Sequence, residues 1–181
     1  MNKVAFLDRD GVINFDKGYV GHWGDFEFMP GVYRALKRLL EHGYKLVIIT
    51  NQSGIARGYF TTEDYQKLTK QYLKKLKSEG IEIAKVYYCP HHKLGRIPEF
   101  SFECDCRKPR TGMIRKAEKE LGIDLENSVL FGDKASDILA GISAGVGKIF
   151  FISSCLDHEY ILNTDIICCP NLKESVDTLI I

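Results

Sequence analysis

The sequence predicts an α/β fold in which helices cover both faces of a mostly parallel β-sheet. Short apolar runs rich in Val, Ile and Phe alternate along the chain with longer stretches of helical periodicity. Polar clusters directly follow several of these runs, which is typical of folds that bind ligands beyond the carboxyl ends of parallel strands. No Pro/Gly/Ser-rich linker divides the 181 residues, so we expect one domain over residues 1–181.

The expected strands and helices follow one another in a regular order. Apolar runs predict strands over residues 3–8, 45–50, 84–89, 128–132 and 148–152. Helical periodicity predicts helices over 31–43, from 61 toward 80, over 111–122 and over 135–145. The first helix ends at Gly43, a suitable C-terminal cap, and the second begins at Thr61, a suitable N-cap. The irregular stretch 89–110 is interpreted as a loop insertion in this alternation.

The charge balance excludes several classes of partner. Lys and Arg number 25 against 24 Asp and Glu, which is not the pattern of a protein that binds nucleic acid or an anionic membrane surface. The N-terminal apolar run is too short for a signal peptide, and no run approaches the roughly eighteen apolar residues of a membrane span. We therefore expect a cytoplasmic protein whose six cysteines are thiols or metal ligands rather than disulfides.

The first expected strand ends at a pair of carboxylates, Asp8 and Asp10, followed by Gly11. Two carboxylates at this spacing can share a hard cation, or one can attack a substrate while the other transfers protons. Gly11 allows the chain to turn sharply after them. Taken alone, such a pair is more often a charged turn after a strand, so this motif is a weak indication of function.

Three further polar clusters occur later in the chain. Residues 50–53, Thr-Asn-Gln-Ser, follow the second strand and offer hydroxyl and amide donors to a phosphoryl group, although a polar turn would have the same composition. Lys108 closes the loop insertion beside Arg107, and such a basic pair is often simply solvated. Asp133 and Asp137 follow the fourth strand, where they could complete a metal site or cap the next helix.

The predicted sheet brings these clusters together. Because the carboxyl ends of parallel strands meet at one edge, three of the strand ends converge there, and Lys108 reaches the same edge from the adjoining loop. The combined set contains a nucleophilic carboxylate, a second acid, neutral donors, an ammonium group and a third carboxylate. This inventory is what phosphoryl transfer requires, so the sequence predicts a phosphoryl-transfer site.

A second cluster has the composition of a zinc site. Cys89 and His91 stand at one end of the loop insertion, and Cys104 and Cys106 stand at the other, each pair separated by one residue. Three thiolates and an imidazole form a suitable tetrahedral set for Zn²⁺, and four protein ligands leave no open position, which favours a structural metal. The remaining cysteines, Cys155, Cys168 and Cys169, are interpreted as ordinary buried side chains.

With Asp8-x-Asp10, Thr50, Lys108 and Gly132-Asp133 followed by Asp137, the sequence resembles the haloacid dehalogenase superfamily of Mg²⁺-dependent phosphotransferases. Longer strings, such as residues 8–14 (DRDGVIN) and 50–58 (TNQSGIARG), resemble the branch of that superfamily that hydrolyses heptose bisphosphates. The resemblance implies a three-layer Rossmann-like haloacid dehalogenase fold with a zinc-binding loop over 89–106. No segment is long enough for a large cap domain, so we expect an open site.

The resemblance also implies a role for each motif residue. Asp8 is the expected nucleophile, which forms an aspartyl-phosphate, and Asp10 is the expected general acid and base. Thr50 and Lys108 stabilise the phosphoryl group, and Mg²⁺ is held by Asp8, by the backbone carbonyl of Asp10 and by Asp133. The expected contacts to a sugar bisphosphate are Asp16, Lys17, Gly18, Tyr19, Thr50, Asn51, Gln52, Ser53, Arg107, Lys108 and Lys134.

Two alternatives remain open beside this interpretation. A histidinol-phosphate phosphatase shares the motifs and the cysteine-rich loop, although the string from Gln52 to Gly58 fits the heptose enzymes better. A phospho-accepting receiver-like module also combines Asp, Thr and Lys in a parallel α/β fold, but Asp10 argues against it. We expect a monomer that acts in the synthesis of ADP-heptose or GDP-heptose precursors, and the preferred anomer of the bisphosphate stays open.

Overall fold

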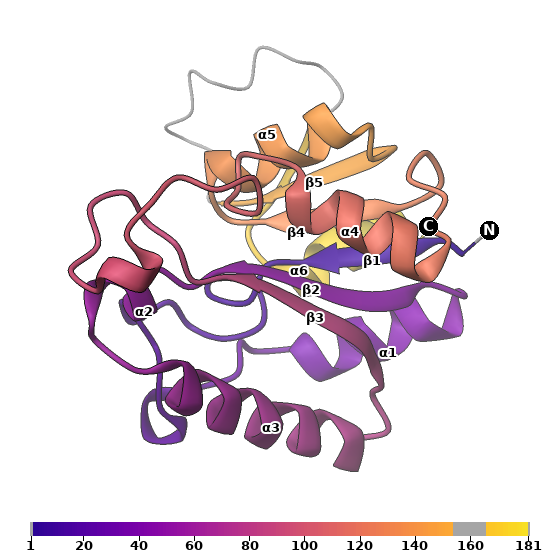
Figure 1. Cartoon of the computed structure of the whole chain (residues 1–181). Coiled ribbons are helices and arrows are strands. Elements are labelled where there is room, and N and C mark those ends of the chain that lie inside the picture. Colours follow the sequence, from indigo (N-terminus) through magenta and orange to yellow (C-terminus); the bar gives the residue numbers. More distant parts are fainter. Residues whose placement is uncertain (1, 154–165, 181) are drawn as a thin grey trace.

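A computed structural model describes residues 2–153 and 166–180, and its centre is a parallel β-sheet (Figure 1). The strand order is β3-β2-β1-β4-β5-β6, and every neighbouring pair is parallel. This arrangement confirms the predicted α/β fold. The strands are β1 (Val4–Leu7), β2 (Lys45–Asn51), β3 (Ile83–Cys89), β4 (Val129–Gly132), β5 (Lys148–Ile152) and β6 (Ile166–Cys169).

The helices agree with the sequence prediction where the amphipathic pattern is long. The predicted helices correspond to α1 (Val32–Glu41), α3 (Thr62–Ser78), α4 (Gly112–Leu121) and α5 (Ala135–Ala144). Thr61 caps α3 as expected, since its side chain accepts a hydrogen bond from the Asp64 backbone N–H. Two helices were not predicted, α2 (Gly54–Arg57) and α6 (Leu172–Leu179).

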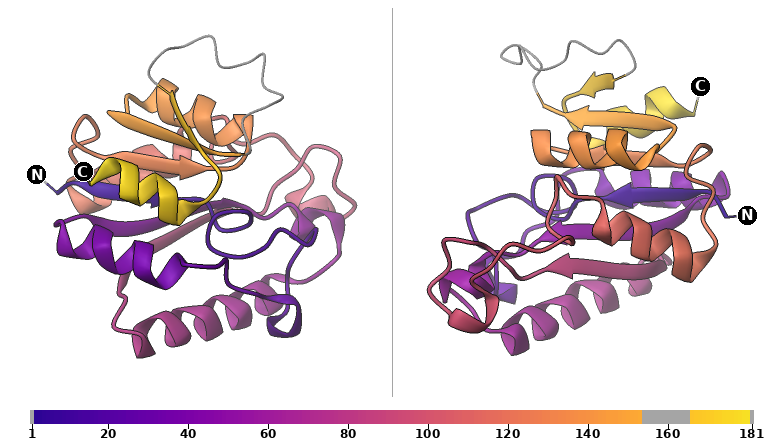
Figure 2. Two further views of the ribbon diagram at one scale, coloured as in Figure 1. Left: turned by 180° about the vertical axis from the view of Figure 1, so that it is seen from behind. Right: turned by 45° about the horizontal axis from the view of Figure 1, so that its top comes forward.

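Helices cover both faces of the sheet, as Figure 2 shows from two directions. Alternate residues of β1 face the two layers. Ala5 and Leu7 of β1 pack in the core formed with α1, α3 and α6. Val4 and Phe6 pack in the second core, formed with α4 and α5. A strand buried on both faces carries no polar alternation, which explains why the sequence reads as continuous apolar runs.

The connections carry little additional structure. Between β1 and α1 the helical structure is the 3-10 helix η1 (Trp23–Asp25), and between β3 and α4 it is η2 (Pro98–Phe100). The expectation that no large cap domain is present therefore holds for the described residues. No helix in the described part of the chain is long and apolar enough to span a membrane.

The sheet order determines which side chains can meet. Strand β1 lies between β2 and β4, with Leu7 in register with Ile48 on one side and Phe131 on the other. The residues that follow these three positions therefore emerge at one edge of the sheet.

The three cysteines outside the loop cluster were expected to be buried side chains. Of these, Cys169 is buried in β6 as expected and Cys168 is only half-buried, whereas Cys155 lies outside the described residues.

Candidate active site

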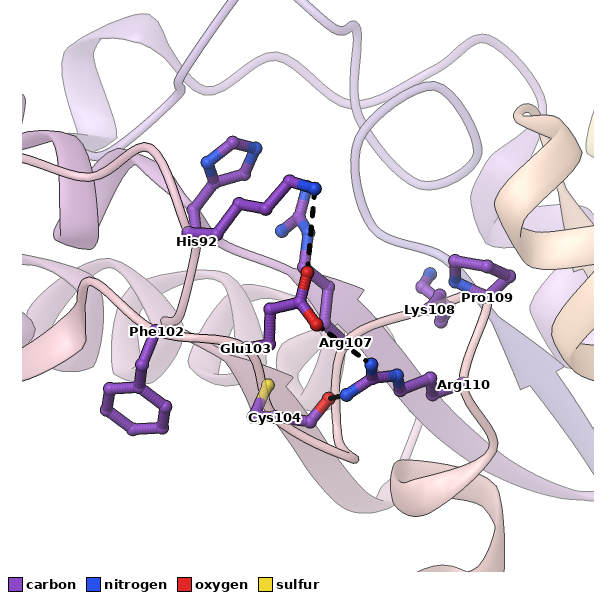
Figure 3. Close-up of a pocket in the computed structure, with 9 residues that line it drawn as sticks. His92, Phe102, Glu103, Cys104, Arg107, Lys108, Pro109 and Arg110 are labelled. Atoms are coloured by element: carbon purple, nitrogen blue, oxygen red, sulfur yellow. Dashed lines mark hydrogen bonds and ion pairs between the residues drawn. The ribbon is translucent and has the colours of Figure 1, made fainter.

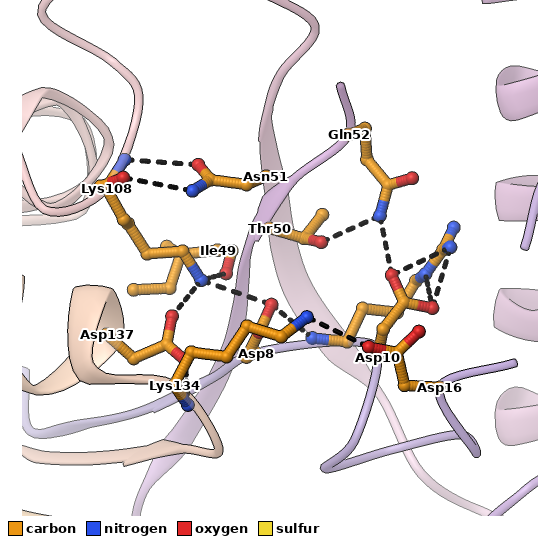
Figure 4. A network of polar contacts seen from close by, with 11 residues as sticks. Asp8, Asp10, Asp16, Ile49, Thr50, Asn51, Gln52, Lys108, Lys134 and Asp137 are labelled. Atoms are coloured by element: carbon orange, nitrogen blue, oxygen red, sulfur yellow. Dashed lines mark hydrogen bonds and ion pairs between the residues drawn. The ribbon is translucent and has the colours of Figure 1, made fainter. Parts of the chain in front are cut away.

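Asp8 lies buried at the carboxyl end of β1, next to an ammonium group (Figure 4). Its Oδ1 accepts a hydrogen bond from the Arg9 backbone N–H at 2.8 Å and lies 3.1 Å from Lys108 Nζ. Lys108 Nζ is also 2.6 Å from Asp137 Oδ1. Burial lowers the pKa of Lys108, but Asp137 and Asp8 outweigh burial, so its pKa is raised and the ammonium group stays charged.

The end of β2 holds Lys108 in this position. The Asn51 side chain donates to the Lys108 carbonyl at 3.1 Å and accepts from the Lys108 backbone N–H at 3.1 Å. Lys108 Nζ donates to the Ile49 carbonyl at 2.7 Å. These bonds attach the loop after β3 to the neighbouring strand, so a residue that is distant in sequence is fixed against Asp8.

Three carboxylates share this small volume. Asp8, Asp133 and Asp137 each place an oxygen within 4.8 Å of the others. Burial, followed by the repulsion of Asp8, raises the pKa of Asp133 to about 8, and burial and Asp137 raise the pKa of Asp8. Asp133 Oδ1 is buried and has no hydrogen-bond partner among the described residues. One ammonium group cannot balance this set, and carboxylate oxygens are the ligands that Mg²⁺ prefers, so the cluster fits a divalent cation.

Gly11 is required where the chain turns past this cluster. Its φ of +86° lies in the left-handed region that favours glycine. A Cβ atom at Gly11 would also lie 2.1 Å from Asp133 Oδ2, which is too close for any side chain. The glycine therefore allows the turn after Asp10 to approach the carboxylate of Asp133.

Asp10 is held by a network of donors. Its Oδ1 accepts from Arg9 Nη2 at 2.9 Å and from Asn14 Nδ2 at 2.9 Å, and its Oδ2 accepts from Gln52 Nε2 at 2.9 Å. The same Gln52 nitrogen donates to Thr50 Oγ1 at 2.8 Å. Sequence reasoning missed Arg9 and Asn14, which are both fully buried, because Arg and Asn are usually exposed.

A cleft of about 340 Å³ adjoins Asp10. It collects most of the expected sugar contacts: Asp16, Gly18, Tyr19, Asn51, Gln52, Ser53, Arg107 and Lys134. Lys17 instead pairs with Glu27 at 2.8 Å and is absent from the lining. Arg57 and Ser136 line the cleft although sequence reasoning did not nominate them as contacts. For Arg57 a signal existed, because it belongs to the string that distinguished the two candidate phosphatase branches.

One cation of the cleft is already paired. Lys134 Nζ lies 2.9 Å from Asp16 Oδ2, and the Gly18 backbone N–H donates to Asp16 Oδ1 at 3.0 Å. Burial raises the pKa of Asp16, but these two donors outweigh it and leave the pKa below its ordinary value. Asp16 is therefore an ionised carboxylate that fixes the loop before Tyr19.

The cysteine cluster has the shape of a tetrahedral site. Sγ of Cys104 lies 3.4 Å from Sγ of Cys89 and 3.2 Å from Sγ of Cys106, and Cys106 Sγ lies 3.4 Å from His91 Nδ1. A tetrahedral zinc ion with Zn–S bonds of about 2.3 Å places its sulfurs about 3.8 Å apart. Small outward shifts of these side chains would therefore accommodate the ion. The four groups can hold a metal between the end of β3 and the return of the loop.

Known proteins share this sequence and fold. The family model described as polynucleotide kinase 3 phosphatase matches residues 3–167. D-glycero-alpha-D-manno-heptose-1,7-bisphosphate 7-phosphatase of Photorhabdus laumondii is 47% identical over 84% of this chain and 83% of its own length. D-glycero-beta-D-manno-heptose-1,7-bisphosphate 7-phosphatase of Helicobacter pylori strain J99 is 44% identical over 97% of this chain and 96% of its own length. The crystal structure of D,D-heptose 1,7-bisphosphate phosphatase from B. bronchiseptica, complexed with magnesium and phosphate, has a TM-score of 0.83 at 27% identity, over 98% of this chain and 97% of that one.

Proposed function

The chain belongs to the polynucleotide kinase 3 phosphatase family of the haloacid dehalogenase superfamily, together with the heptose-bisphosphate 7-phosphatases, and from that premise we propose its reaction. It is a phosphatase that hydrolyses a phosphoric monoester. Its substrate is D-glycero-D-manno-heptose 1,7-bisphosphate, from which it removes the 7-phosphate. The observation that carries the proposal is the buried Asp8 carboxylate with Lys108 Nζ at 3.1 Å, beside a cleft that Asp10 lines.

Asp8 is the proposed nucleophile because its oxygen is buried beside a cation that offsets the charge of an approaching phosphate. Its attack on phosphorus forms an aspartyl-phosphate while the bond from phosphorus to the sugar oxygen breaks. Asp10 gives its proton to that oxygen and then takes a proton from the water that cleaves the aspartyl-phosphate. Lys108 and the Thr50 hydroxyl stabilise the phosphoryl oxygens during both steps.

Mg²⁺ is the proposed catalytic cofactor, and Asp8, Asp133 and the backbone carbonyl of Asp10 would hold it. When bound, the cation supplies Lewis acidity and offsets the charge that the phosphate brings into an already anionic cluster. The unpartnered Oδ1 of Asp133 and its raised pKa support this role. The B. bronchiseptica relative complexed with magnesium is consistent with it.

Zn²⁺ is the proposed structural metal of the loop, held by Cys89, His91, Cys104 and Cys106. With four protein ligands no position remains for substrate, so its contribution is to fix the loop. Arg107 follows the last ligand directly and lines the cleft, and its Nη1 donates to the His91 carbonyl at 3.4 Å. The zinc loop therefore positions a side chain of the cleft.

Phosphate release tests the proposal. The assay compares both anomers of heptose 1,7-bisphosphate with histidinol phosphate, first with Mg²⁺ removed by a chelator and then with Mg²⁺ restored. We expect multiple turnovers on the bisphosphate that depend on Mg²⁺, with much slower release from histidinol phosphate. Faster release from histidinol phosphate would assign the alternative substrate, and a single turnover would identify a phospho-accepting module. The favoured anomer indicates whether the product serves the ADP-heptose or the GDP-heptose precursor route.

A further inference from the structure

Two guanidinium groups in the cleft have no carboxylate partner among the described residues. Arg57 and Arg107 both line the cleft, and neither makes an ion pair there. The third cation of the cleft, Lys134, is neutralised by Asp16 at 2.9 Å. This end of the cleft therefore carries an excess of positive charge that the reaction at Asp8 does not use.

A neighbouring hollow, which shares Arg107 with the cleft, shows the contrasting case (Figure 3). Its volume is about 220 Å³. Lys108 lines it too but is paired with Asp8 and Asp137, and the cations that remain besides Arg107 are Lys93 and Arg110. Glu103 neutralises both, with its oxygens 3.5 Å from Lys93 Nζ and 3.2 Å from Arg110 Nη2. The cations without a carboxylate partner among the described residues of the two pockets are thus Arg57 and Arg107, and both line the cleft.

The surroundings of Arg57 hold its side chain but leave a donor available. Nη2 lies 3.2 Å from His92 Nε2, and the centre of the guanidinium lies 5.9 Å from the centroid of the Tyr19 ring. Nε is buried and has no hydrogen-bond partner among the described residues. A buried donor without an acceptor is unfavourable, so this position is suited to an anionic ligand that brings the acceptor.

The zinc loop determines where Arg57 stands. Arg57 is the last residue of α2, and the carbonyl of the residue before it, Ala56, accepts hydrogen bonds from the backbone N–H groups of Arg96 at 2.7 Å and Ile97 at 2.9 Å. His92 belongs to the same loop. The helix end and the side chain are therefore both fastened to the loop that carries Arg107.

We propose that Arg57 is a specificity-determining residue that binds the second, non-reacting phosphate of a sugar bisphosphate, paired with Arg107. This inference rests on the proposed function, in which the reacting phosphate occupies Asp8 and Lys108. Guanidinium groups bind phosphate oxygens with two charge-assisted hydrogen bonds, and a partly buried site strengthens them. The same charge repels a phosphate ester with an ammonium group at its far end, such as histidinol phosphate, so Arg57 also discriminates against that substrate.

The test compares two substrates with three variants. Heptose 1,7-bisphosphate carries the second phosphate, whereas a hexose 6-phosphate presents a similar primary phosphate ester without it. Arg57→Gln removes the charge, and Arg57→Lys keeps the charge but loses the fork of donors. Arg96→Gln is the matched control, because Arg96 is exposed, belongs to the same loop and does not line the cleft.

We expect Arg57→Gln to raise KM for the bisphosphate about 10- to 100-fold with little change in kcat, in line with the loss of hydrogen bonds to a charged group. The variant should leave kcat/KM for the hexose 6-phosphate and the inhibition by inorganic phosphate unchanged. Arg57→Lys should fall between Arg57→Gln and the unsubstituted protein, and Arg96→Gln should match the unsubstituted protein. Inhibition by heptose 1-phosphate should weaken in parallel with the rise in KM.

Equal losses on both substrates in Arg57→Gln and Arg57→Lys would overturn the proposal, because they would show that Arg57 acts only by holding the loop through His92. Unchanged kinetics on both substrates would overturn it as well. A failure of the proposed function has a different signature. In that case the unsubstituted protein would itself hydrolyse the bisphosphate no better than the hexose 6-phosphate.

Discussion

Two clusters of the molecule hold several ligand groups close together, the carboxylates at the strand ends and the cysteines and histidine of the loop. They differ in what keeps the groups in place. Asp8 and Asp133 follow neighbouring strands of the sheet, whose register is fixed by backbone hydrogen bonds. Cys89 ends β3, but Cys104 and Cys106 return from an irregular loop. The backbone therefore imposes the first cluster, whereas the second lies in a loop that we expect a bound metal to make rigid.

This difference has an energetic consequence. The sheet forces carboxylates together although they repel one another, which is why burial and neighbouring charge raise the pKa values of both Asp8 and Asp133. Thiols in the loop can stay neutral until a metal binds, so that cluster stores no comparable repulsion. A change at the strand ends should consequently affect chemistry most, and a change in the loop should affect binding.

The sharpest test at the strand ends is Asp8→Asn. We expect activity to fall by at least about 10⁴-fold, because an amide oxygen is a poor nucleophile. Without divalent cations the variant should melt at a higher temperature than the unsubstituted protein, since one repelling charge is gone. Phosphate release and thermal melting in a chelator measure the two effects. Asp25→Asn, at an exposed position, is the control, and turnover by Asp8→Asn within tenfold of it would exclude the proposed nucleophile.

Removing the single ammonium group should break the balance of the same cluster. Lys108→Gln leaves Asp8 and Asp137 buried without their shared cation, which typically costs about 3–5 kcal/mol of unfolding free energy. Activity should fall about 10²- to 10³-fold, because a stabilising charge at the phosphoryl group is lost. Chemical denaturation and phosphate release measure these effects. Lys116→Gln, at an exposed position, should change neither, and a Lys108→Gln protein of unchanged stability would contradict the proposed pairing.

The same contrast explains how much could be predicted from the sequence. The strand ends were predictable because apolar runs fix the strands, and a parallel sheet fixes which ends meet. The clustering of Cys89, His91, Cys104 and Cys106 was predictable from paired spacing alone, with no knowledge of the loop between them. Both predictions rest on short-range patterns combined with one general rule of geometry.

What could not be predicted depends on tertiary contacts of single residues. Helix α2 has four residues, too few to show a helical period. The string that contains Arg57 marked this segment, but the helix that places Arg57 at the cleft could not be predicted. Arg9 is fully buried because Asp10 accepts from it, and composition gives no sign of such a pair. Helix α6 was missed although its cap was visible, since Asn171 accepts from the Glu174 backbone N–H as an N-cap residue should.

The repulsion among the carboxylates also predicts a pH dependence for the protein without divalent cations. The folded-state pKa of Asp133 is about 8, above its ordinary value of 3.8, so between these values the folded state binds more protons than the unfolded state. The free energy of unfolding should therefore decrease as pH rises from about 4 to 8, since stability falls with pH wherever the folded state holds the extra proton. Denaturation in a chelator at several pH values measures this slope, which Asp133→Asn or added Mg²⁺ should flatten. An unchanged slope in Asp133→Asn would remove Asp133 as its source.

Loss of one zinc ligand should have the smallest effect on chemistry and so completes the contrast between the clusters. Cys104→Ser breaks the tetrahedral set, and the loop that carries Arg107 and contacts α2 loses its restraint. We expect reduced zinc content, faster proteolysis within residues 90–106 and a rise of about tenfold in KM with little change in kcat, because the groups around Asp8 are fixed by the sheet. Cys169→Ser, in the buried core of β6, is the matched control: it should lower the melting temperature but leave zinc content and KM unchanged. If Cys104→Ser reduced kcat as strongly as we expect Lys108→Gln to do, the loop metal would itself support catalysis. The assignment of chemistry to the strand-end cluster and of substrate binding to the loop would then be wrong.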